Sequence, residues 1–238
     1  MASVFKKATE NILRLDIPFD HLYTSVFLIL GDTPIIVDSA TTREDVSCRI
    51  LPALDAMGIQ CARLLITHRH GDHNGGTPFL LVARPEISPL TLGDGAHFEN
   101  VEAILLGGHT EDSIGYYDTR TKTLLCGDAL QFYGVGKYGC SISYAEMYED
   151  TLNKLEALAP HAILPSHDFV GGKACAIGEE EVKKLLASAR TIWEEIKAFV
   201  LSFPTNTDPF AVVRAWKEAH PTLPPLPSVT VTSIRKNA

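Results

Sequence analysis

The sequence has few cysteines and no long apolar run, and both absences limit what this protein can be. Five cysteines are present in 238 residues, and no two of them form a C-x-x-C pair. This odd number favours reduced thiols over a disulfide framework. The segment MASVFKKATENILRL lacks the continuous apolar stretch of a signal peptide, and the run VFLIL is far shorter than a membrane span. We therefore expect a soluble, cytoplasmic protein with no membrane partner.

An excess of positive charge and several catalytic motifs are also lacking. The formal net charge is −8, so the long-range attraction to nucleic acid is absent, and nucleic acid is not an expected partner. No G-x-S-x-G, H-E-x-x-H or Walker A motif occurs. The stretch GVGKYG satisfies G-x-G-x-x-G, but no dinucleotide-binding βαβ unit surrounds it, so we interpret it as a loop near the site.

The order of strand-like and helix-like segments predicts a layered α/β protein. Apolar and branched runs such as YTSVFLIL, PIIVDS, ARLLIT, VEAILL, TLLCG and HAILP indicate strands. Helical spacing of apolar residues follows Thr42 as far as Gly58, with a kink expected at Pro52, and recurs in YEDTLNKLEAL and EEEVKKLLASARTIWEEIKAFV. A further short helix is expected from Asp208 until PTLPPLP ends it. Such alternation is typical of helices that cover packed sheets.

The stretch ITHRHGDHNGG places an unusual density of imidazole and carboxylate after a buried strand. His68 and His70 are two apart and can point to one side of an extended segment. Asp72 and His73 follow a glycine, where the chain can turn toward a second point. The pattern favours two metal ions held by one loop over a merely polar surface loop. The glycines at 75 and 76 are expected to let the backbone turn sharply.

The motif T-H-x-H-x-D-H-x-G-G resembles the signature of the metallo-β-lactamase superfamily of dinuclear metallohydrolases. The later ligands of that family have counterparts in GGHTEDS, LLCGDAL and AILPSHD, which supply His109, Asp128 and His167. By this resemblance the first ion would be held by His68, His70 and His109, the second by Asp72, His73 and His167, and Asp128 would bridge the two.

The resemblance also implies a fold and a domain organisation. It implies an α/β protein with a four-layered αββα sandwich, comprising a catalytic domain at residues 1–175 and a helical extension at 176–238 packed on the same domain. Asp38 matches a family position near the metal loop that orients a ligand, although a plain turn-forming Asp fits equally well. Two features depart from the family: Gly107 stands where a Pro is usual, and the interval between His73 and His109 is short. The cleft is therefore expected to be open, or closed by another segment or by a second subunit in a homodimer.

The ligand set implies metal-dependent hydrolysis of a small acyl substrate. Imidazole and carboxylate suit two divalent ions, with Zn²⁺ first and Fe or Mn also open. A metal-bridged hydroxide would attack a thioester, ester or lactone carbonyl, and Asp72 would orient or deprotonate the water. This function resembles that of glyoxalase II and of lactone hydrolases, whereas true β-lactamases of the superfamily carry Cys or Ser in place of Asp128.

Two alternatives stay open: a persulfide dioxygenase with a single iron, and a non-catalytic protein that retains its metals. In the segment after Asp128, Tyr133 and Tyr138 are candidate substrate contacts. They are equally expected to pack the loop onto the domain.

Overall fold

The structure, a computed structural model, describes residues 4–19, 22–130, 142–167, 175–223 and 225–237. It contains two six-stranded sheets, ordered β1-β2-β3-β4-β5-β6 and β12-β11-β10-β9-β8-β7. The strands of the first sheet are β1 (Lys6–Lys7), β2 (Ile12–Phe19), β3 (Leu22–Ile29), β4 (Ile35–Val37), β5 (Ala62–Leu65) and β6 (Ile87–Pro89). Those of the second are β7 (His97–Phe98), β8 (Val101–Leu105), β9 (Ile114–Asp118), β10 (Thr123–Gly127), β11 (Ala162–Pro165) and β12 (Ala176–Ile177).

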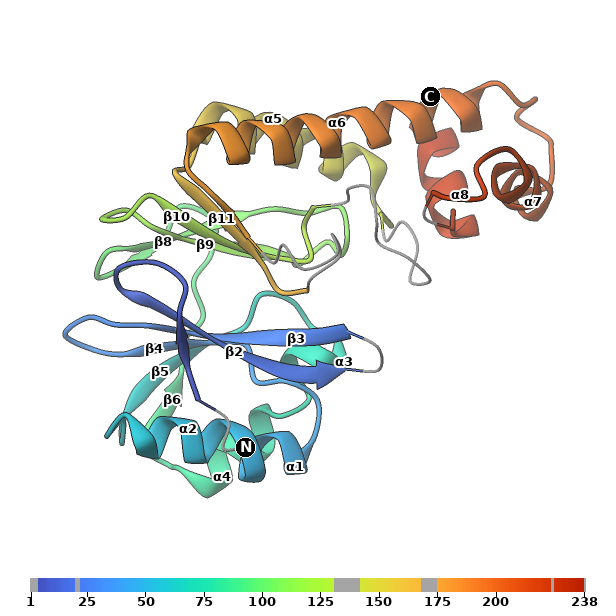
Figure 1. The fold of residues 1–238 in the computed structure, drawn as a ribbon. Helices are drawn as coiled ribbons and strands as arrows, with labels where there is room; N and C mark the ends of the chain where they lie inside the picture. The colour runs from blue at the N-terminus through green and yellow to red at the C-terminus, as the bar shows by residue number, and fades with distance from the viewer. Residues whose placement is uncertain (1–3, 20–21, 131–141, 168–174, 224, 238) are drawn as a thin grey trace.

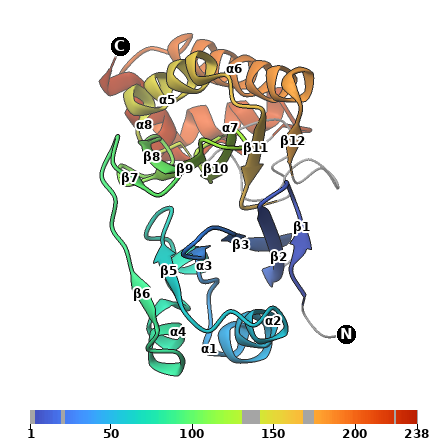
Figure 2. The same ribbon diagram turned by 90° about the vertical axis from the view of Figure 1, so that its left-hand side faces the viewer.

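Helices form the two outer layers. The α-helices of the described residues are α1 (Arg43–Asp45), α2 (Leu51–Ala56), α3 (Gly71–Asn74), α4 (Thr77–Ala83), α5 (Ala145–Leu158), α6 (Glu179–Leu201), α7 (Pro209–Ala219) and α8 (Ser228–Lys236). Figure 1 shows α1, α2 and α4 under the first sheet, the two sheets face to face, and α5 and α6 over the second sheet. Figure 2 shows the chain crossing between the sheets from β6 to β7. The predicted four-layered αββα sandwich is confirmed.

Three apolar clusters hold these layers together. The inter-sheet cluster is built from side chains on the facing sides of both sheets, among them Phe27, Val37, Leu65, Tyr116, Leu125 and Leu164. A second cluster lies between the first sheet and α2 and α4, and a third joins the second sheet to the C-terminal helices. Burial of these side chains removes apolar surface from water, which is the main force that holds the layers together.

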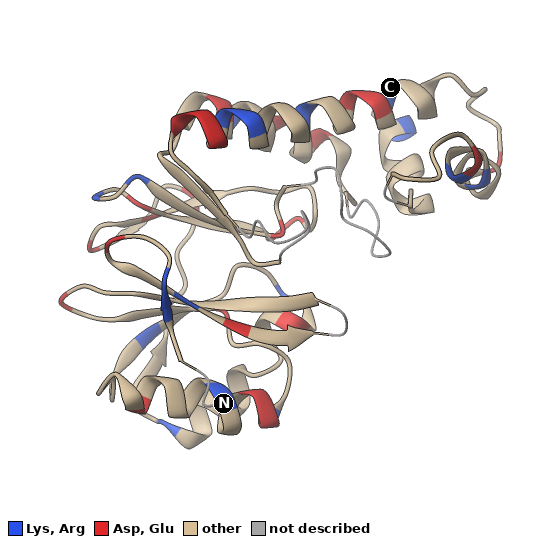
Figure 3. Ribbon diagram, in the orientation of Figure 1, with Lys and Arg blue, Asp and Glu red and all other residues tan. Residues whose placement is uncertain are grey.

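The long helix α6 is amphipathic. Its first turn carries Glu179, Glu180 and Glu181, which interact favourably with the helix dipole. Val182, Leu186, Ala189, Trp193, Ile196 and Val200 are buried at helical spacing. Figure 3 shows acidic and basic segments interspersed along the rest of this helix. One face therefore packs on the sheet and the other meets solvent.

Strand ends from both sheets meet at one edge of the sandwich. In the second sheet β10 and β11 are parallel, with Gly127 opposite Pro165. The two sheets are joined there by backbone hydrogen bonds, from Ser25 N to Ser166 O at 2.7 Å and from Ile114 N to Thr67 O at 2.8 Å. Residues that follow β5, β10 and β11 are thus brought together at this edge.

The helix expected after Thr42 differs from the prediction at its centre. Val46–Ile50 form a π-helical turn between α1 and α2, and Leu51 N donates to Val46 O. Pro52 has no N–H to donate to the carbonyl four residues earlier, and a wider turn accommodates the loss. The kink expected at Pro52 therefore takes the form of this turn.

The C-terminal segment packs on the second sheet. β12 pairs with β11 in an antiparallel manner, and buried residues of α6, α7 and α8 share one cluster with residues of that sheet. The division at residue 175 stays a prediction. Among the described residues, no helix is both long enough and apolar enough to span a membrane.

Candidate metal centre

The motif loop follows the buried end of β5, and a hydrogen bond to Asp38 anchors its start. Thr67 N donates to Asp38 Oδ1 at 2.8 Å, so the backbone is anchored one residue before His68. His70 is extended, with φ −63° and ψ 149°, and the single turn of α3 follows directly. His68 and His73 are buried, whereas His70 is exposed. The loop thus presents its polar side chains at the edge where the two sheets meet.

The other three candidate ligands follow strands of the second sheet. His109 lies in the turn after β8, Asp128 directly follows β10, and His167 comes after β11. Ser166 N donates to Gly127 O at 3.1 Å, so the residues next to Asp128 and His167 are held side by side.

Three histidines form the first part of the cluster. His68 Nε2 lies 3.0 Å from His70 Nδ1, and His109 Nε2 lies 2.9 Å from the same nitrogen. All three ligand atoms are within 4.8 Å of one another. This group matches the set proposed for the first ion.

The second part joins carboxylates and histidines. His167 Nε2 lies 3.2 Å from Asp72 Oδ2, 3.2 Å from Asp128 Oδ2 and 3.3 Å from His73 Nε2. Asp128 Oδ2 is also 3.8 Å from His109 Nε2, so this carboxylate reaches both groups. The structure therefore brings all seven candidate ligands together, with Asp128 between the two sets.

Hydrogen bonds outside the cluster orient two of the imidazoles. His73 Nδ1 lies 2.8 Å from Asp38 Oδ2, and His167 Nδ1 lies 2.8 Å from the carbonyl oxygen of Tyr23. Both partners are acceptors, so each Nδ1 donates and each Nε2 is the nitrogen available to a metal. Asp128 Oδ1 is buried with no hydrogen-bond partner among the described residues. Imidazole nitrogens and carboxylate oxygens in this arrangement fit a divalent cation such as Zn²⁺.

The electrostatics of the cluster also suit a cation. Burial disfavours charge on His167, but Asp128 outweighs this effect and raises the pKa of His167 to about 10. Burial likewise opposes ionisation of Asp128, yet His167 and His73 hold its pKa well below the usual value. By contrast, burial and the nearby His73 lower the pKa of His68 to about 2, so this ring is neutral. The carboxylates thus stabilise positive charge at this end of the sandwich. A bound metal ion would provide that charge in place of the proton on His167.

Asp38 occupies the position expected of an orienting residue. It is fully buried, with a positive φ of 66°, and its carboxylate accepts from Thr67 Oγ1 at 3.0 and 2.9 Å as well as contacting His73. A non-glycine residue in this backbone conformation is uncommon, although Asp tolerates it better than most. These contacts fit the orienting role, which stays a prediction.

Sequence reasoning missed two outer partners of the cluster. Thr67 Oγ1 lies 3.1 Å from His68 Nδ1, and the Tyr23 carbonyl accepts from His167. The contact of Thr67 could have been predicted, because this Thr is the first residue of the motif. The second is a backbone group, which carries no side-chain signal, and only the fold, which brings β3 next to the residues that follow β11, reveals it.

The glycines at the end of the motif lie in the turn between α3 and α4 and allow close packing. Gly75 and Gly76 have helical dihedral angles. A Cβ on Gly76 would collide with the carbonyl oxygen of Ser39, and one on Gly75 with that of Thr41. Both residues form the turn between α3 and α4, as expected, and glycine is required there because space is short and not because of a left-handed backbone.

Gly107, which replaces the usual Pro, is also explained by packing. A Cβ there would lie against Met147 of α5, and Thr151 Oγ1 donates to the Gly107 carbonyl at 2.6 Å. Helix α5 thus holds the turn that carries His109. Tyr133, Tyr138 and the stretch GVGKYG lie outside the described residues.

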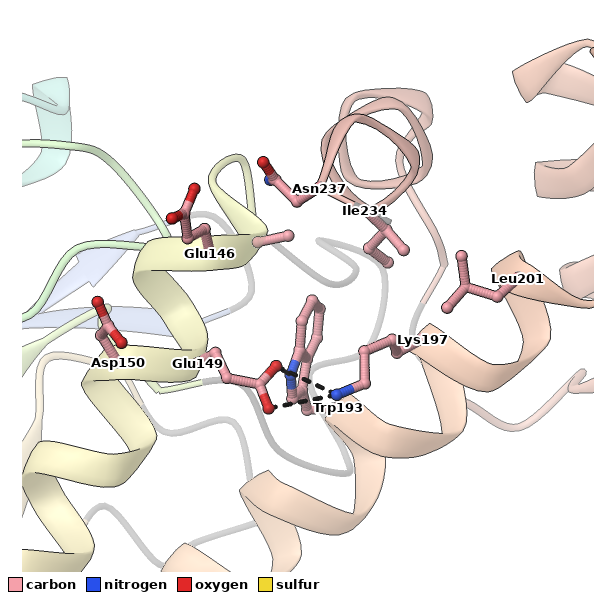
Figure 4. Close-up of a pocket in the computed structure, with 9 residues that line it drawn as sticks. Glu146, Glu149, Asp150, Trp193, Lys197, Leu201, Ile234 and Asn237 are labelled. Carbon is pink, nitrogen blue, oxygen red and sulfur yellow. Dashed lines mark hydrogen bonds and ion pairs between the residues drawn. The ribbon is translucent and has the colours of Figure 1, made fainter. Parts of the chain in front are cut away.

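A separate cavity of about 420 Å³ lies among α5, α6 and α8. In Figure 4, Glu149 of α5 faces Trp193 and Lys197 of α6. Glu149 Oε2 accepts from Trp193 Nε1 at 2.9 Å and from Lys197 Nζ at 3.1 Å. These polar groups are paired with one another, and no candidate metal ligand lines this cavity.

Comparisons with known proteins point to one family. A family model described as the metallo-beta-lactamase superfamily matches residues 20–89. A hydroxyacylglutathione hydrolase of Aliivibrio salmonicida is 35% identical over 219 residues, covering 71% of this chain and 85% of that protein. The lactamase-like protein nscB of Trichophyton rubrum is 29% identical, covering 58% of this chain and 54% of its own length. For two further relatives the match covers 51% and 59% of the relative's length. The chain therefore spans about half the length of several of these proteins.

A solved structure shares the fold. The metallo-beta-lactamase FIM-1 from Pseudomonas aeruginosa, solved in a mono-zinc form, superposes with a TM-score of 0.63 at 16% identity, covering 81% of this chain and 97% of that one. At this identity the likeness concerns the fold alone. Together with the Aliivibrio relative and the clustered motif residues, it shows that the chain belongs to the metallo-β-lactamase superfamily.

Proposed function

We propose that this chain is a metal-dependent hydrolase that binds two divalent ions, with Zn²⁺ as the first choice and Fe or Mn as alternatives. The observation that carries the proposal is the convergence of the seven candidate ligands into two adjoining sets. His68, His70 and His109 would hold one ion, and Asp72, His73 and His167 the other. Asp128 would bridge them.

Two divalent ions in this donor set would supply Lewis acidity toward a carbonyl oxygen and a water of lowered pKa. Asp72 would act as the orienting or proton-accepting carboxylate. Its Oδ2 lies 3.2 Å from His167 Nε2 and 3.5 Å from Thr24 Oγ1, so it is held from two sides. Burial opposes its ionisation, but the hydrogen bond with His167 lowers its pKa below the usual value. The group is therefore an ionised acceptor near neutral pH.

The substrate class we propose is a small thioester, ester or lactone. The hydroxyacylglutathione hydrolase names of two relatives support a thioester. A cavity of about 570 Å³ lined by His68 and by apolar residues that include Leu90, Leu92 and Ile114 would suit the carbon chain of an acyl group. Tyr133 and Tyr138 remain proposed substrate contacts.

A substrate panel tests this proposal. Purified protein is assayed against acyl-thioesters, lactones, a phosphodiester and a chromogenic β-lactam, with bound metal measured by elemental analysis. We expect about two metal equivalents and turnover in the first two classes. Asp72→Asn should abolish that turnover, because it removes the proton acceptor, while the exposed Asp32→Asn should retain it. Phosphodiester turnover alone would contradict the proposal. One tightly bound iron with oxygen uptake on a persulfide would replace it with a dioxygenase, and metal binding without turnover would leave a binding protein.

A further inference from the structure

One ion pair connects the two loops that carry the three-histidine set. Arg69 lies between His68 and His70, and its Nε donates to Asp112 Oδ2 at 2.7 Å. Asp112 is three residues after His109. The pair therefore links the loop after β5 with the turn after β8.

Among the described residues, His70 has fewer outer partners than His68, His73 and His167. His73 and His167 each have an outer hydrogen-bond partner, and His68 contacts Thr67. Within the described part of the chain, the polar and ring contacts of the His70 side chain are with His68 and His109. The residue is exposed, so burial does not fix the ring in place.

The turn that carries Asp112 is a firm attachment point. Thr110 Oγ1 and Ser113 Oγ lie 2.8 Å apart within it, and the backbone bond from Ile114 to Thr67 ties it to the first sheet. The Arg69 side chain is 73% exposed, so its ion pair contributes little to global stability. Its consequence is local and concerns how His70 is placed.

The charge of Arg69 allows two possible effects on cation binding to be distinguished, namely direct repulsion and the positioning of His70. Arg69 is a positive charge beside a proposed cation site, and a guanidinium there repels the cation. If charge alone mattered, removing Arg69 would tighten cation binding. If the link positions His70, removing Arg69 would weaken binding in spite of the lost repulsion.

We infer that the Arg69–Asp112 ion pair positions His70 against His68 and His109 and thereby sets the affinity of this set for a divalent cation. The inference rests on the proposed metal-binding function. Arg69 and Asp112 are positioning residues, since neither belongs to the ligand set.

The test is a Zn²⁺ titration of the metal-stripped full-length protein in competition with a chromophoric chelator. Arg69→Gln should weaken one of two zinc equivalents by about 3–10-fold and leave the other unchanged, a smaller loss than for a direct partner of a ligand. Asp112→Asn should weaken the same equivalent to a similar extent, because it removes the 2.7 Å partner of Arg69 and leaves only the 3.9 Å contact with Glu111. The double variant should be no weaker than the worse single variant, because both changes break one link.

Asp55→Asn is the matched control, because it removes the Arg84–Asp55 pair at 2.6 Å in a part of the protein that holds no candidate ligand. Both zinc affinities should be unchanged in this control, and the stripped variants should melt at the wild-type temperature. Tighter or unchanged zinc binding by Arg69→Gln would overturn this inference but not the proposed function. A wild-type protein that binds no zinc would overturn the proposed function and this inference with it.

Discussion

At the residue scale, Asp38 connects backbone conformation to the candidate ligands. Its carboxylate accepts from Thr67 N and Thr67 Oγ1 and also holds His73 Nδ1. One buried side chain therefore fixes both the start of the motif loop and the ring orientation of a candidate ligand. Its left-handed backbone is the local cost of that placement, of the kind found at functional sites.

Asp38→Asn should weaken zinc binding by about 10–100-fold, because Asn keeps the shape and tolerates the backbone but removes the charged acceptor of His73. The free energy of unfolding of the stripped protein should also fall, by about 1–3 kcal/mol. Chelator competition and urea unfolding measure the two effects. The control is Asp118→Asn. It changes a buried carboxylate at the last residue of β9, outside the candidate ligand set, that accepts from Thr121 N. Equal loss of zinc affinity in both variants would contradict the orienting role of Asp38.

At the element scale, helix α8 braces the chain that leads into α5. Thr230 Oγ1 donates to the buried Ile142 carbonyl at 2.6 Å, and Ala145 N donates to Ser233 Oγ at 2.8 Å. The next residues, Ser143 and Tyr144, donate their backbone N–H groups to the carbonyl oxygen of Gly108. The C-terminal helix is thus connected through a short segment to the turn that carries His109.

Thr230→Val should lower the free energy of unfolding by about 1–3 kcal/mol, because Val fills the same space and leaves the Ile142 carbonyl without its donor. Thr232→Val is the matched control in the same helix, since Thr232 is exposed and donates only to Ser228 within α8. This control should stay within about 0.5 kcal/mol of the wild type. Denaturant unfolding of both variants measures the difference, and equal stability of the two would show that α8 does not brace this segment.

Elements with strong local patterns were predictable from the sequence, and those formed by tertiary packing were not. The runs before the motif loop, Asp128 and His167 are apolar and branched, so β5, β10 and β11 were expected. Helix α8, with the sequence SVTVTSIRK, was missed because its β-branched residues have low helix propensity, and burial of Val231 and Ile234 decides its form. The edge strands β1, β7 and β12 are two residues long and follow from pairing alone.

The candidate site shows the same division. The ligand residues could be predicted because imidazole and carboxylate at this spacing are rare. The outer contacts of Tyr23 and Arg69 could not, since each joins segments that only the fold brings together.

At the scale of the whole molecule, the candidate metal centre joins the two sheets. The motif loop follows a strand of the first sheet, whereas His109, Asp128 and His167 follow strands of the second. The unfolded chain cannot hold these groups together, so a metal that binds only the folded state stabilises it.

Zinc at about 100 times its dissociation constant should add about 2.7 kcal/mol per site, which for a chain of this size raises the melting temperature by about 5–10 °C. Calorimetry of stripped and zinc-loaded protein measures this shift. His167→Ala should lose part of it, because the link from the second sheet is removed, while His161→Ala changes an exposed histidine outside the cluster and should keep it. A melting temperature that does not respond to zinc, or an equal response in His167→Ala and wild type, would show that the metals do not join the sheets through His167.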